Sequence, residues 1–343
     1  MSTEHLAAIL PSKGGPLSVE PRPTPTPGPN ELLIEVNSIA LNPIDYNMRD
    51  KGFMIASYPA VVGSDIAGTV ISTGSSVPSD APQVGTRVAA FAPCFLKRGA
   101  PDYGAFQKKV LVPSANAVPL PDQVSFNEAA LLPMAVQTTW AGWYSMGIPC
   151  DMTFKAGPNQ GMLIWGGASS VGSTAIQTAH LLGFKVYATA STKHHDYLKN
   201  LGAKRIFDYK DENVIASIVK AVREDQVALY LGYDAVGALQ PCEEVLKRLN
   251  GDGTKLVTTV PLRADSPKIA GVDTVFVAAP ADEVQRTEFS RFVFGEWLQG
   301  KLATGAFKPC PGLRVVEGGF EGLDRGLDEL RKGVSGVKLV VEV

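Results

Sequence analysis

The residues best suited to chemistry in this sequence form a glycine- and serine-rich turn near the middle of the chain. The segment from Gly161 to Gly172 reads Gly-Met-Leu-Ile-Trp-Gly-Gly-Ala-Ser-Ser-Val-Gly, which predicts a short apolar strand, a tight turn and the start of a helix. The first N–H groups of a helix have no partner within it, and the positive end of the helix dipole lies there. The turn is therefore predicted to bind a phosphate-bearing anion.

The spacing of this turn follows the Gly-x-Gly-x-x-Gly fingerprint of dinucleotide-binding folds, with one change. The three positions are Gly167, Ser169 and Gly172, so a serine replaces the glycine that lets the backbone approach a diphosphate. The alternative is a turn that binds nothing, but the strand before it and the helix after it favour a dinucleotide. The expected diphosphate contacts are Gly167, Ala168, Ser169, Ser170, Val171 and Gly172.

The turn after the next predicted strand indicates which dinucleotide binds. An Asp or Glu there would accept hydrogen bonds from a ribose diol, but residues 189–194 read Thr-Ala-Ser-Thr-Lys-His and hold no carboxylate. Ser191 and Lys193 offer a hydroxyl and a positive charge to a 2′-phosphate, and Tyr209 lies just past the third strand. We therefore predict NADP(H) as the cofactor, with His194 near its adenine end.

The bulk composition argues against several other classes of protein. The chain has 343 residues, of which 45% are hydrophobic and 19% charged, so two ordinary domains can each bury a core. A formal net charge of −2 gives no reason to expect nucleic acid or a membrane as a partner. The four cysteines form no Cys-x-x-Cys pair, so no structural zinc is predicted. Because no apolar run suits a membrane span or a secretory signal, we expect a cytoplasmic protein.

The pattern of elements changes along the chain. The middle third alternates short apolar strands with helices, which predicts a doubly wound parallel sheet, and residues 288–298 predict a further helix. The first third has short strands separated by Gly and Pro, for example at residues 31–36 and 65–71, as in a compact β-rich domain. The proline-rich stretch at residues 21–30 is predicted to be an extended connector into the first of these strands.

Several motifs together resemble those of the medium-chain dehydrogenases and reductases. They are Asn42-Pro-Ile-Asp45, Gly63-Ser-Asp-Ile-Ala-Gly68, Val84-Gly-Thr-Arg-Val88, Gly166-Gly-Ala-Ser-Ser-Val-Gly172 and Asp234-Ala-Val-Gly237. The resemblance implies an α/β protein with a GroES-like β-rich catalytic domain at residues 1–126 and 288–343. It also implies a Rossmann NADP-binding domain with a doubly wound parallel sheet at residues 127–287.

The sequence departs from the zinc alcohol dehydrogenases of this family at the positions of the metal ligands. Those enzymes place a cysteine near Asn42 and a Gly-His-Glu at residues 63–65, which here read Gly-Ser-Asp. Asp65 alone cannot hold a catalytic zinc, which needs three protein ligands, so no metal site is predicted. The chain is similar to the zinc-independent branch of quinone reductases, enone reductases and fungal stand-alone enoyl reductases. Several fungal members carry a lysine where this chain has Asn47.

The resemblance also implies which residues meet the nicotinamide and the substrate. Tyr46, Thr139 and Asn42 are the candidate catalytic residues, with a packing role as the alternative for Tyr46. Thr138 and Thr139 lie where the family's helix meets the nicotinamide, and their alternative is a hydrogen bond to their own helix. The other implied cofactor contacts are Asp45, Asn47, Val260, Pro261, Val337 and Lys338.

These residues favour a reductase of carbon–carbon double bonds. Without a metal to stabilise an alkoxide, hydride addition to an activated C=C is easier than alcohol oxidation. We expect an NADPH-dependent reductase of a small apolar conjugated carbonyl compound, such as an enone, a quinone or an enoyl compound. Two alternatives remain: an enoyl reductase acting on a carrier-bound polyketide chain, and an NADPH-binding protein with little turnover. No basic patch in the sequence marks a carrier dock, and a monomer or homodimer is expected.

Overall fold

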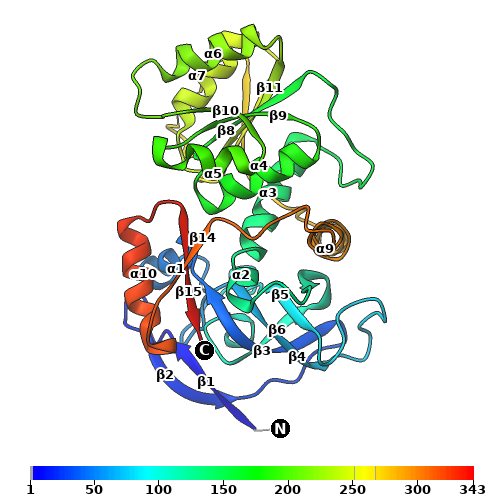
Figure 1. The fold of residues 1–343 in the computed structure, drawn as a ribbon. Helices are drawn as coiled ribbons and strands as arrows, with labels where there is room; N and C mark the ends of the chain where they lie inside the picture. The colour runs from blue at the N-terminus through cyan, green and yellow to red at the C-terminus, as the bar shows by residue number, and fades with distance from the viewer. Residues whose placement is uncertain (1–2, 251, 267) are drawn as a thin grey trace. The chain divides into compact units, whose positions relative to one another are not determined.

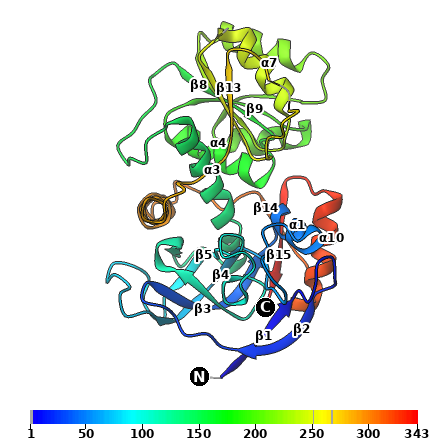
Figure 2. The same cartoon turned by 180° about the vertical axis from the view of Figure 1, so that it is seen from behind.

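A computed structural model of the chain describes residues 3–250, 252–266 and 268–343 (Figures 1 and 2). It divides into two compact units, one comprising Met1–Met134 with Ser290–Val343 and the other comprising Ala135–Phe289. The first unit is rich in strands, and the second has a parallel sheet between helices. The fold class predicted from the sequence is therefore confirmed, whereas the domain boundaries after residues 126 and 287 stay predictions.

The second unit is built on a six-stranded parallel sheet. Its strand order is β10-β9-β8-β11-β12-β13, so the chain moves outward from β8 to β10 and then returns to the other side of β8 at β11. This reversal is the topological switch point at which open α/β sheets bind ligands, outside the carboxyl ends of the strands. The strands are β8 (Gln160–Trp165), β9 (Lys185–Thr189), β10 (Ala203–Phe207), β11 (Ala228–Asp234), β12 (Thr254–Thr258) and β13 (Val272–Phe276).

Helices cover both faces of this sheet. Figure 1 shows α4 and α5 on one face, and α6 and α7 on the other. Because the sheet is covered on both sides, its central strands are continuous apolar runs such as Met-Leu-Ile-Trp in β8. The helices are α3 (Pro133–Met146), which begins in the first unit, α4 (Ser170–Leu181), α5 (His195–Asn200) after the 3₁₀ turn η3 (Thr192–His194), α6 (Val214–Glu224), α7 (Leu239–Asn250) and α8 (Glu283–Ser290).

The main sheet of the first unit joins the two ends of the sequence. Its order is β14-β15-β3-β4-β5-β7, and β6 also pairs with β3. The C-terminal β15 runs antiparallel to β3 with Val340 opposite Ala40, and Ala40 in turn lies opposite Asp65 of β4. The strands are β3 (Glu31–Ala40), β4 (Asp65–Thr73), β5 (Arg87–Phe91), β6 (Lys109–Pro113), β7 (Ala117–Pro119), β14 (Gly312–Val315) and β15 (Val337–Glu342).

Short helices complete the first unit around a core of Leu, Ile, Val and Ala side chains from β3, β4, β5 and β15. Among the described residues, no helix of either unit combines the length and apolar character that crossing a bilayer requires. The remaining elements are α1 (Pro43–Lys51), η1 (Pro101–Tyr103), η2 (Ser114–Asn116), α2 (Phe126–Ala130), η4 (Arg291–Leu298), α9 (Gln299–Ala303), η5 (Gly319–Gly322) and α10 (Leu323–Lys332).

Two expectations about elements were wrong in part. The proline-rich stretch does not begin as a connector, because Pro21, Arg22 and Pro23 belong to β2 (Ser18–Pro23), which pairs with β1 (Glu4–Ile9). The two form a separate two-stranded sheet, and proline is tolerated in such edge strands. The helix expected at residues 288–298 is also longer, because α8, the π-helical η4 and α9 follow one another without a break from Glu283 to Ala303.

We predict that Arg49 is a stabilising link between α1 and α10. Its side chain is 7% exposed and contacts Asp50 at 2.7 Å, Asp324 at 2.9 Å and Asp328 at 2.6 Å. An Arg49→Met variant should lower the free energy of unfolding by about 3 kcal/mol, measured by urea denaturation, because it strips the carboxylates of their partly buried cation. Arg331→Met is the matched control, since Arg331 contacts Asp50 and Asp328 from a half-exposed position and should cost less than about 1 kcal/mol. Equal losses for the two variants would contradict this role.

Candidate functional site

The glycine- and serine-rich turn connects β8 to α4 at the carboxyl edge of the parallel sheet. Gly166 has a φ of +81°, which favours glycine, and a Cβ added to Gly172 would lie 2.2 Å from the Gly166 carbonyl oxygen. The turn is fastened to β9 because the Gly167 N–H donates to the Thr189 carbonyl oxygen at 2.8 Å. The first residues of α4 are thus packed directly against the turn, which fixes where their free N–H groups lie.

Two serines define what the turn can bind. Ser169 caps α4, since its Oγ accepts a hydrogen bond from the Gly172 N–H at 3.0 Å, and its own hydroxyl proton remains available to donate. The Oγ of Ser170 is buried and has no hydrogen-bond partner within the described part of the chain. An unpaired hydroxyl beside the first N–H groups of a twelve-residue helix fits a phosphate group. The residues present therefore fit the diphosphate of a dinucleotide.

The turn after β9 contains the residues expected at the 2′-phosphate and also one that was missed. Ser191 and Tyr209 bring their hydroxyl oxygens to 3.4 Å, and Lys193 is exposed beside them. Asp208 also reaches this turn, where its Oδ2 accepts a hydrogen bond from the Thr192 hydroxyl at 2.7 Å. Residues 189–194 contain no carboxylate, but β10 ends beside β9, so the register brings the carboxylate of Asp208 to this turn from the next loop.

The Asp208 carboxylate is already used by neighbouring groups. The Lys210 N–H donates to its Oδ1 at 3.0 Å, and this bond together with the Thr192 hydroxyl lowers the pKa of Asp208. His194, one residue beyond Lys193, is partly exposed, and burial together with the Lys193 charge lowers the pKa of its ring. The turn thus presents an ammonium group and two hydroxyls beside a carboxylate that is committed to the protein.

On the other side of the switch point, Asp234 holds the loops after β11 and β12 together. Its Oδ1 accepts hydrogen bonds from the backbone N–H groups of residues 236–238 at 2.9 to 3.1 Å, and its Oδ2 accepts one from the Thr258 hydroxyl at 3.0 Å. Val260 and Pro261 follow β12 and are exposed, as a backbone contact with a ligand would require. Asp234 was quoted only as part of a motif, and its positioning role was missed.

In the first unit, a cluster of polar side chains is centred on Asp65, which is completely buried. Its Oδ2 accepts hydrogen bonds from the Lys338 ammonium at 2.5 Å and from the Asn42 side-chain amide at 2.9 Å. Its Oδ1 accepts one from the Met134 N–H at 2.6 Å, at the start of α3. Lys338 also donates to the Leu131 carbonyl oxygen at 3.1 Å. One carboxylate therefore joins β4, β15, α1 and α3.

Lys338 was expected either to contact the cofactor or to be a solvated lysine of the strand. The structure excludes the solvated lysine, because the side chain is 3% exposed and its ammonium lies between Asp65 and Leu131, whereas the contact with the cofactor stays a prediction. Val337, its neighbour in β15, is partly exposed. Asn42 is also nearly buried, and its amide group donates to Asp65 and, at 3.4 Å, to the Ala40 carbonyl oxygen. Its two amide protons are therefore used inside the unit.

Asp45 is a second buried carboxyl next to this cluster. Its Oδ2 accepts a hydrogen bond from the Asn42 N–H at 2.8 Å, as part of the N-terminal cap of α1, and its Oδ1 has no partner among the residues described. Complete burial raises the pKa of Asp45 to about 8, and the negative charge of Asp65 acts in the same direction. A pKa of about 8 favours the protonated form of Asp45 at neutral pH.

The remaining candidate residues lie on α1 and α3. Tyr46 packs partly against the core of the first unit, and the Asn47 amide donates to the Pro43 carbonyl oxygen at 2.8 Å within its own helix. In the second unit Thr138 is partly exposed, and its carbonyl oxygen accepts a hydrogen bond from a buried tyrosine. Thr139 is completely buried, and its hydroxyl has no partner in the described residues. The alternative of a hydrogen bond to its own helix is therefore not what Thr139 does.

Comparison with known proteins identifies both units. Residues 28–122 match the family "Alcohol dehydrogenase GroES-like domain", and residues 170–285 match "Zinc-binding dehydrogenase". The trans-enoyl reductase tndF of Aspergillus flavipes is 46% identical over 99% of both chains. The trans-enoyl reductase tazE of Aspergillus terreus is 48% identical over 85% of this chain and 97% of its own. The chain belongs to the medium-chain dehydrogenase/reductase family.

Solved structures agree with this assignment at the level of the fold. An alcohol dehydrogenase superfamily protein from Novosphingobium aromaticivorans has a TM-score of 0.80 at 23% identity, with 99% of both chains covered. A quinone oxidoreductase of Pseudomonas syringae has a TM-score of 0.76 at 22% identity, covering 99% of this chain and all of its own. The resemblance drawn from the sequence is confirmed, and this medium-chain enzyme is an oxidoreductase that binds a nicotinamide dinucleotide.

The residues of this medium-chain enzyme do not fit a catalytic zinc ion. At the positions where zinc-dependent relatives were expected to place ligands stand Asn42, Ser64 and Asp65, of which only Asp65 is a usual zinc ligand. Its carboxylate is already bound by an ammonium, an amide and a backbone N–H. Across the described ranges, no group of three or more His, Cys, Asp or Glu side chains is arranged to hold a metal ion.

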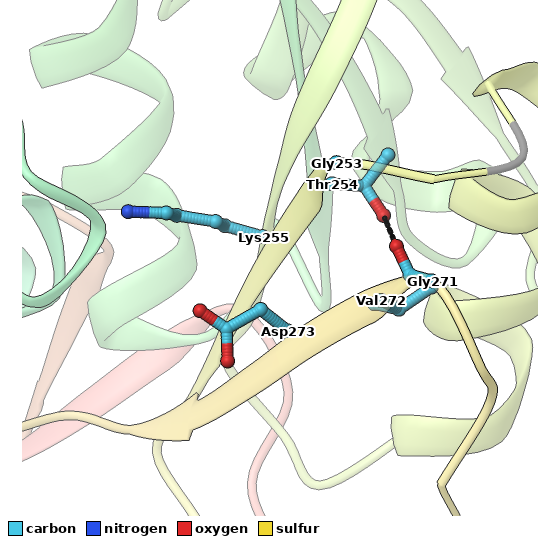
Figure 3. Close-up of a pocket in the computed structure, with 6 residues that line it drawn as sticks. All are labelled: Gly253, Thr254, Lys255, Gly271, Val272 and Asp273. Carbon is cyan, nitrogen blue, oxygen red and sulfur yellow. Dashed lines mark hydrogen bonds between the residues drawn. The ribbon is translucent and has the colours of Figure 1, made fainter.

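The second unit also has an open depression on its surface (Figure 3). It has a volume of about 490 Å³ and is lined by residues 253–255 and 271–273, at the amino ends of β12 and β13. Its lining includes the hydrogen bond from the Thr254 hydroxyl to the Gly271 carbonyl oxygen at 3.2 Å. Since ligands of this fold bind at the carboxyl ends of the strands, this depression is not part of the candidate site.

The buried carboxyl of Asp45 predicts an unusual pH dependence of stability. Between its ordinary pKa of 3.8 and about 8, folded Asp45 keeps a proton that the unfolded chain releases, so its contribution to the free energy of unfolding falls as the pH rises. The slope should reach about 1.4 kcal/mol per pH unit. Asp45→Asn mimics the protonated carboxyl and should be clearly more stable than the unchanged protein at pH 8, but not at pH 4.

Urea denaturation at the two pH values measures this effect. Asp122→Asn is the control, because Asp122 is an exposed aspartate of the same unit and its replacement should leave the pH dependence as it was. An Asp45→Asn variant with an unaltered pH dependence would show that Asp45 is ionised in the folded protein.

Proposed function

We propose that this protein is an NADPH-dependent enoyl reductase that needs no metal ion and reduces the C=C bond of an α,β-unsaturated thioester. We further propose that a separate carrier protein holds the substrate, because two relatives at 46% and 48% identity are named trans-enoyl reductases. The observation that carries the proposal is the Asp65 cluster, whose carboxylate is committed to Lys338, Asn42 and the Met134 N–H. A carboxylate held in this way is not free to ligate zinc, and the addition of a hydride to an activated C=C can be assisted by hydroxyl donors in place of a metal.

The second unit supplies the proposed cofactor site. Bound at this site, a nicotinamide dinucleotide supplies the hydride. The hydroxyls of Ser169 and Ser170 and the first N–H groups of α4 would hold its diphosphate. Ser191 and Lys193 would bind a 2′-phosphate, and Tyr209 would lie against the same group. The Asp208 carboxylate is directed toward the Thr192 hydroxyl and the Lys210 N–H, whereas the exposed Lys193 offers a positive charge to a 2′-phosphate, which favours NADP(H) over NAD(H).

The proposed chemistry requires a donor for the substrate oxygen. Hydride addition to the β-carbon moves negative charge to the thioester oxygen, and a positioned hydroxyl stabilises that charge. Thr139 is the strongest candidate, because its buried hydroxyl has no partner within the part of the chain described. The hydroxyl of Tyr46 is a second candidate for this role or for protonating the α-carbon. Asn42 is an unsuitable donor, since both of its amide protons are used.

The Lys193→Ala variant tests the choice of cofactor. Loss of a charge-assisted contact should raise the KM for NADPH by about tenfold or more and leave the KM for NADH within about twofold. Lys199→Ala is the control, because Lys199 is an exposed lysine on the following helix. Initial rates with both cofactors measure the effect, and equal changes for NADPH and NADH would refute binding of a 2′-phosphate by Lys193.

The activity itself is tested by NADPH consumption with crotonyl-pantetheine, an aliphatic enone and a quinone. We expect the thioester to be reduced fastest, and Thr139→Val to lower its kcat about 100-fold with unchanged NADPH affinity. Thr139→Ser keeps the hydroxyl and should retain most of the activity. If none of the compounds oxidises NADPH, the alternative of an NADPH-binding protein with little turnover is correct. A cytoplasmic location and a monomeric or homodimeric state stay predictions.

A further inference from the structure

We propose that three adjoining loops of the first unit form a docking surface for the carrier protein that presents the acyl chain. This inference rests on the proposed function, because only a carrier-bound substrate requires such a surface. The loops comprise residues 11–15, between β1 and β2, residues 51–59, from the last residue of α1 onward, and residues 93–101, from after β5 to the start of η1. We call them the docking loops.

Contacts join the docking loops into one surface. The Ala56 N–H donates to the Arg98 carbonyl oxygen at 2.9 Å, which links the second loop to the third. A Cβ added to Gly99 would lie 3.3 Å from the Ile55 side chain, so these loops are also in close contact beside that bond. A Cβ added to Gly52 would lie 3.4 Å from the Lys13 side chain, which brings the first loop against the second.

The docking loops expose large apolar side chains. Phe53 is 47% exposed, Leu96 is 44% exposed and Met54 is 42% exposed, and Tyr58 is also exposed. Four such side chains on touching loops present more apolar surface than a single exposed residue would, and apolar surface of this kind marks binding sites. Met54 and Arg98 also have φ values of 57° and 55°, so both loops accept backbone strain to keep this shape.

The same loops are positively charged. They contain Lys13, Lys51, Lys97 and Arg98, all exposed, and their sequences contain no Asp or Glu. This local excess of four cations stands against a net charge of −2 for the whole chain. The sequence showed no basic patch because the cations come from three separate segments, which only the fold brings together. A surface of this charge attracts an anionic partner and speeds its association.

A carrier protein bearing an acyl-phosphopantetheine arm matches this combination of properties. Its arm joins the protein through a phosphodiester, which carries a negative charge, and the acyl chain at the other end is apolar. Two of the docking loops follow α1 and β5. Asn42, which caps the start of α1, and Asp65, at the start of β4, belong to the polar cluster of the same unit. The docking loops therefore belong to the unit that contains this cluster.

The experiment compares two substrates that differ only in the carrier. Crotonyl thioester is supplied on a purified acyl carrier protein or as crotonyl-pantetheine, and kcat/KM is measured with NADPH for each. In the variant with Lys97→Glu and Arg98→Glu, we expect kcat/KM for the carrier-bound thioester to fall at least about tenfold and to become insensitive to salt. The value for crotonyl-pantetheine should stay within about twofold.

Two further variants control for general effects. Lys199→Glu with Lys220→Glu reverses two exposed charges of the second unit and should alter neither rate by more than about twofold. Leu96→Ser, which removes one exposed apolar side chain, should lower only the rate with the carrier protein. Equal losses of kcat/KM on both thioesters, or no loss on either, would contradict the proposed docking surface.

Two other outcomes are separable from these results. If neither thioester is reduced, the proposed function fails. Calorimetric measurement of the binding of the loaded carrier protein then still tests the docking surface. Binding that the charge reversal does not weaken would then overturn it. If the reversal instead abolishes binding to vesicles of phosphatidylserine and leaves the carrier kinetics unaltered, the loops form a lipid-binding surface and the proposal is wrong.

Discussion

The structure depends on one buried carboxylate, that of Asp65. A charge in this position is tolerated only because the Lys338 ammonium neutralises it and the Asn42 amide and the Met134 N–H complete its hydrogen bonds. These donors come from the C-terminal strand, the cap of α1 and the beginning of α3, so a single ion pair holds segments that are distant in sequence. The α3 helix continues into the second unit and carries Thr138 and Thr139. The ion pair thus fixes the start of the helix on which the proposed donor lies.

The two units divide the proposed chemistry between them. In the second unit, the strand order reverses between β8 and β11, and tight glycine packing places the serines of the β8–α4 turn at the carboxyl edge. In the first unit, the pairing of β15 with β3 brings Lys338 to Asp65. Asp45 remains neutral beside this pair because burial and the Asp65 charge both oppose its ionisation. In this chain, the polar cluster of the first unit contains an internal ammonium, that of Lys338.

The sequence was sufficient to predict the fold and the turn between β8 and α4, because both follow from local patterns: alternating strands and helices, and a small-residue turn before a helix. The binding of a diphosphate by this turn stays a prediction. It was insufficient where distant segments meet. The ion pair of Lys338 with Asp65 was not predicted, since nothing local shows that β15 pairs with β3 beside Asp65. Asp208 was missed because β10 brings it to the Thr192 hydroxyl from outside the inspected turn. The docking loops were missed for the same reason, since their cations are divided among three segments.

The central claim is that the Lys338–Asp65 ion pair, and no metal ion, organises the polar cluster of the first unit. The most direct test is metal analysis of the purified protein by mass spectrometry, together with crotonyl-pantetheine reduction before and after dialysis against a strong zinc chelator. The account predicts no stoichiometric zinc and the same turnover before and after chelation. One zinc ion per chain, with turnover that is lost on chelation and restored by added zinc, would contradict it.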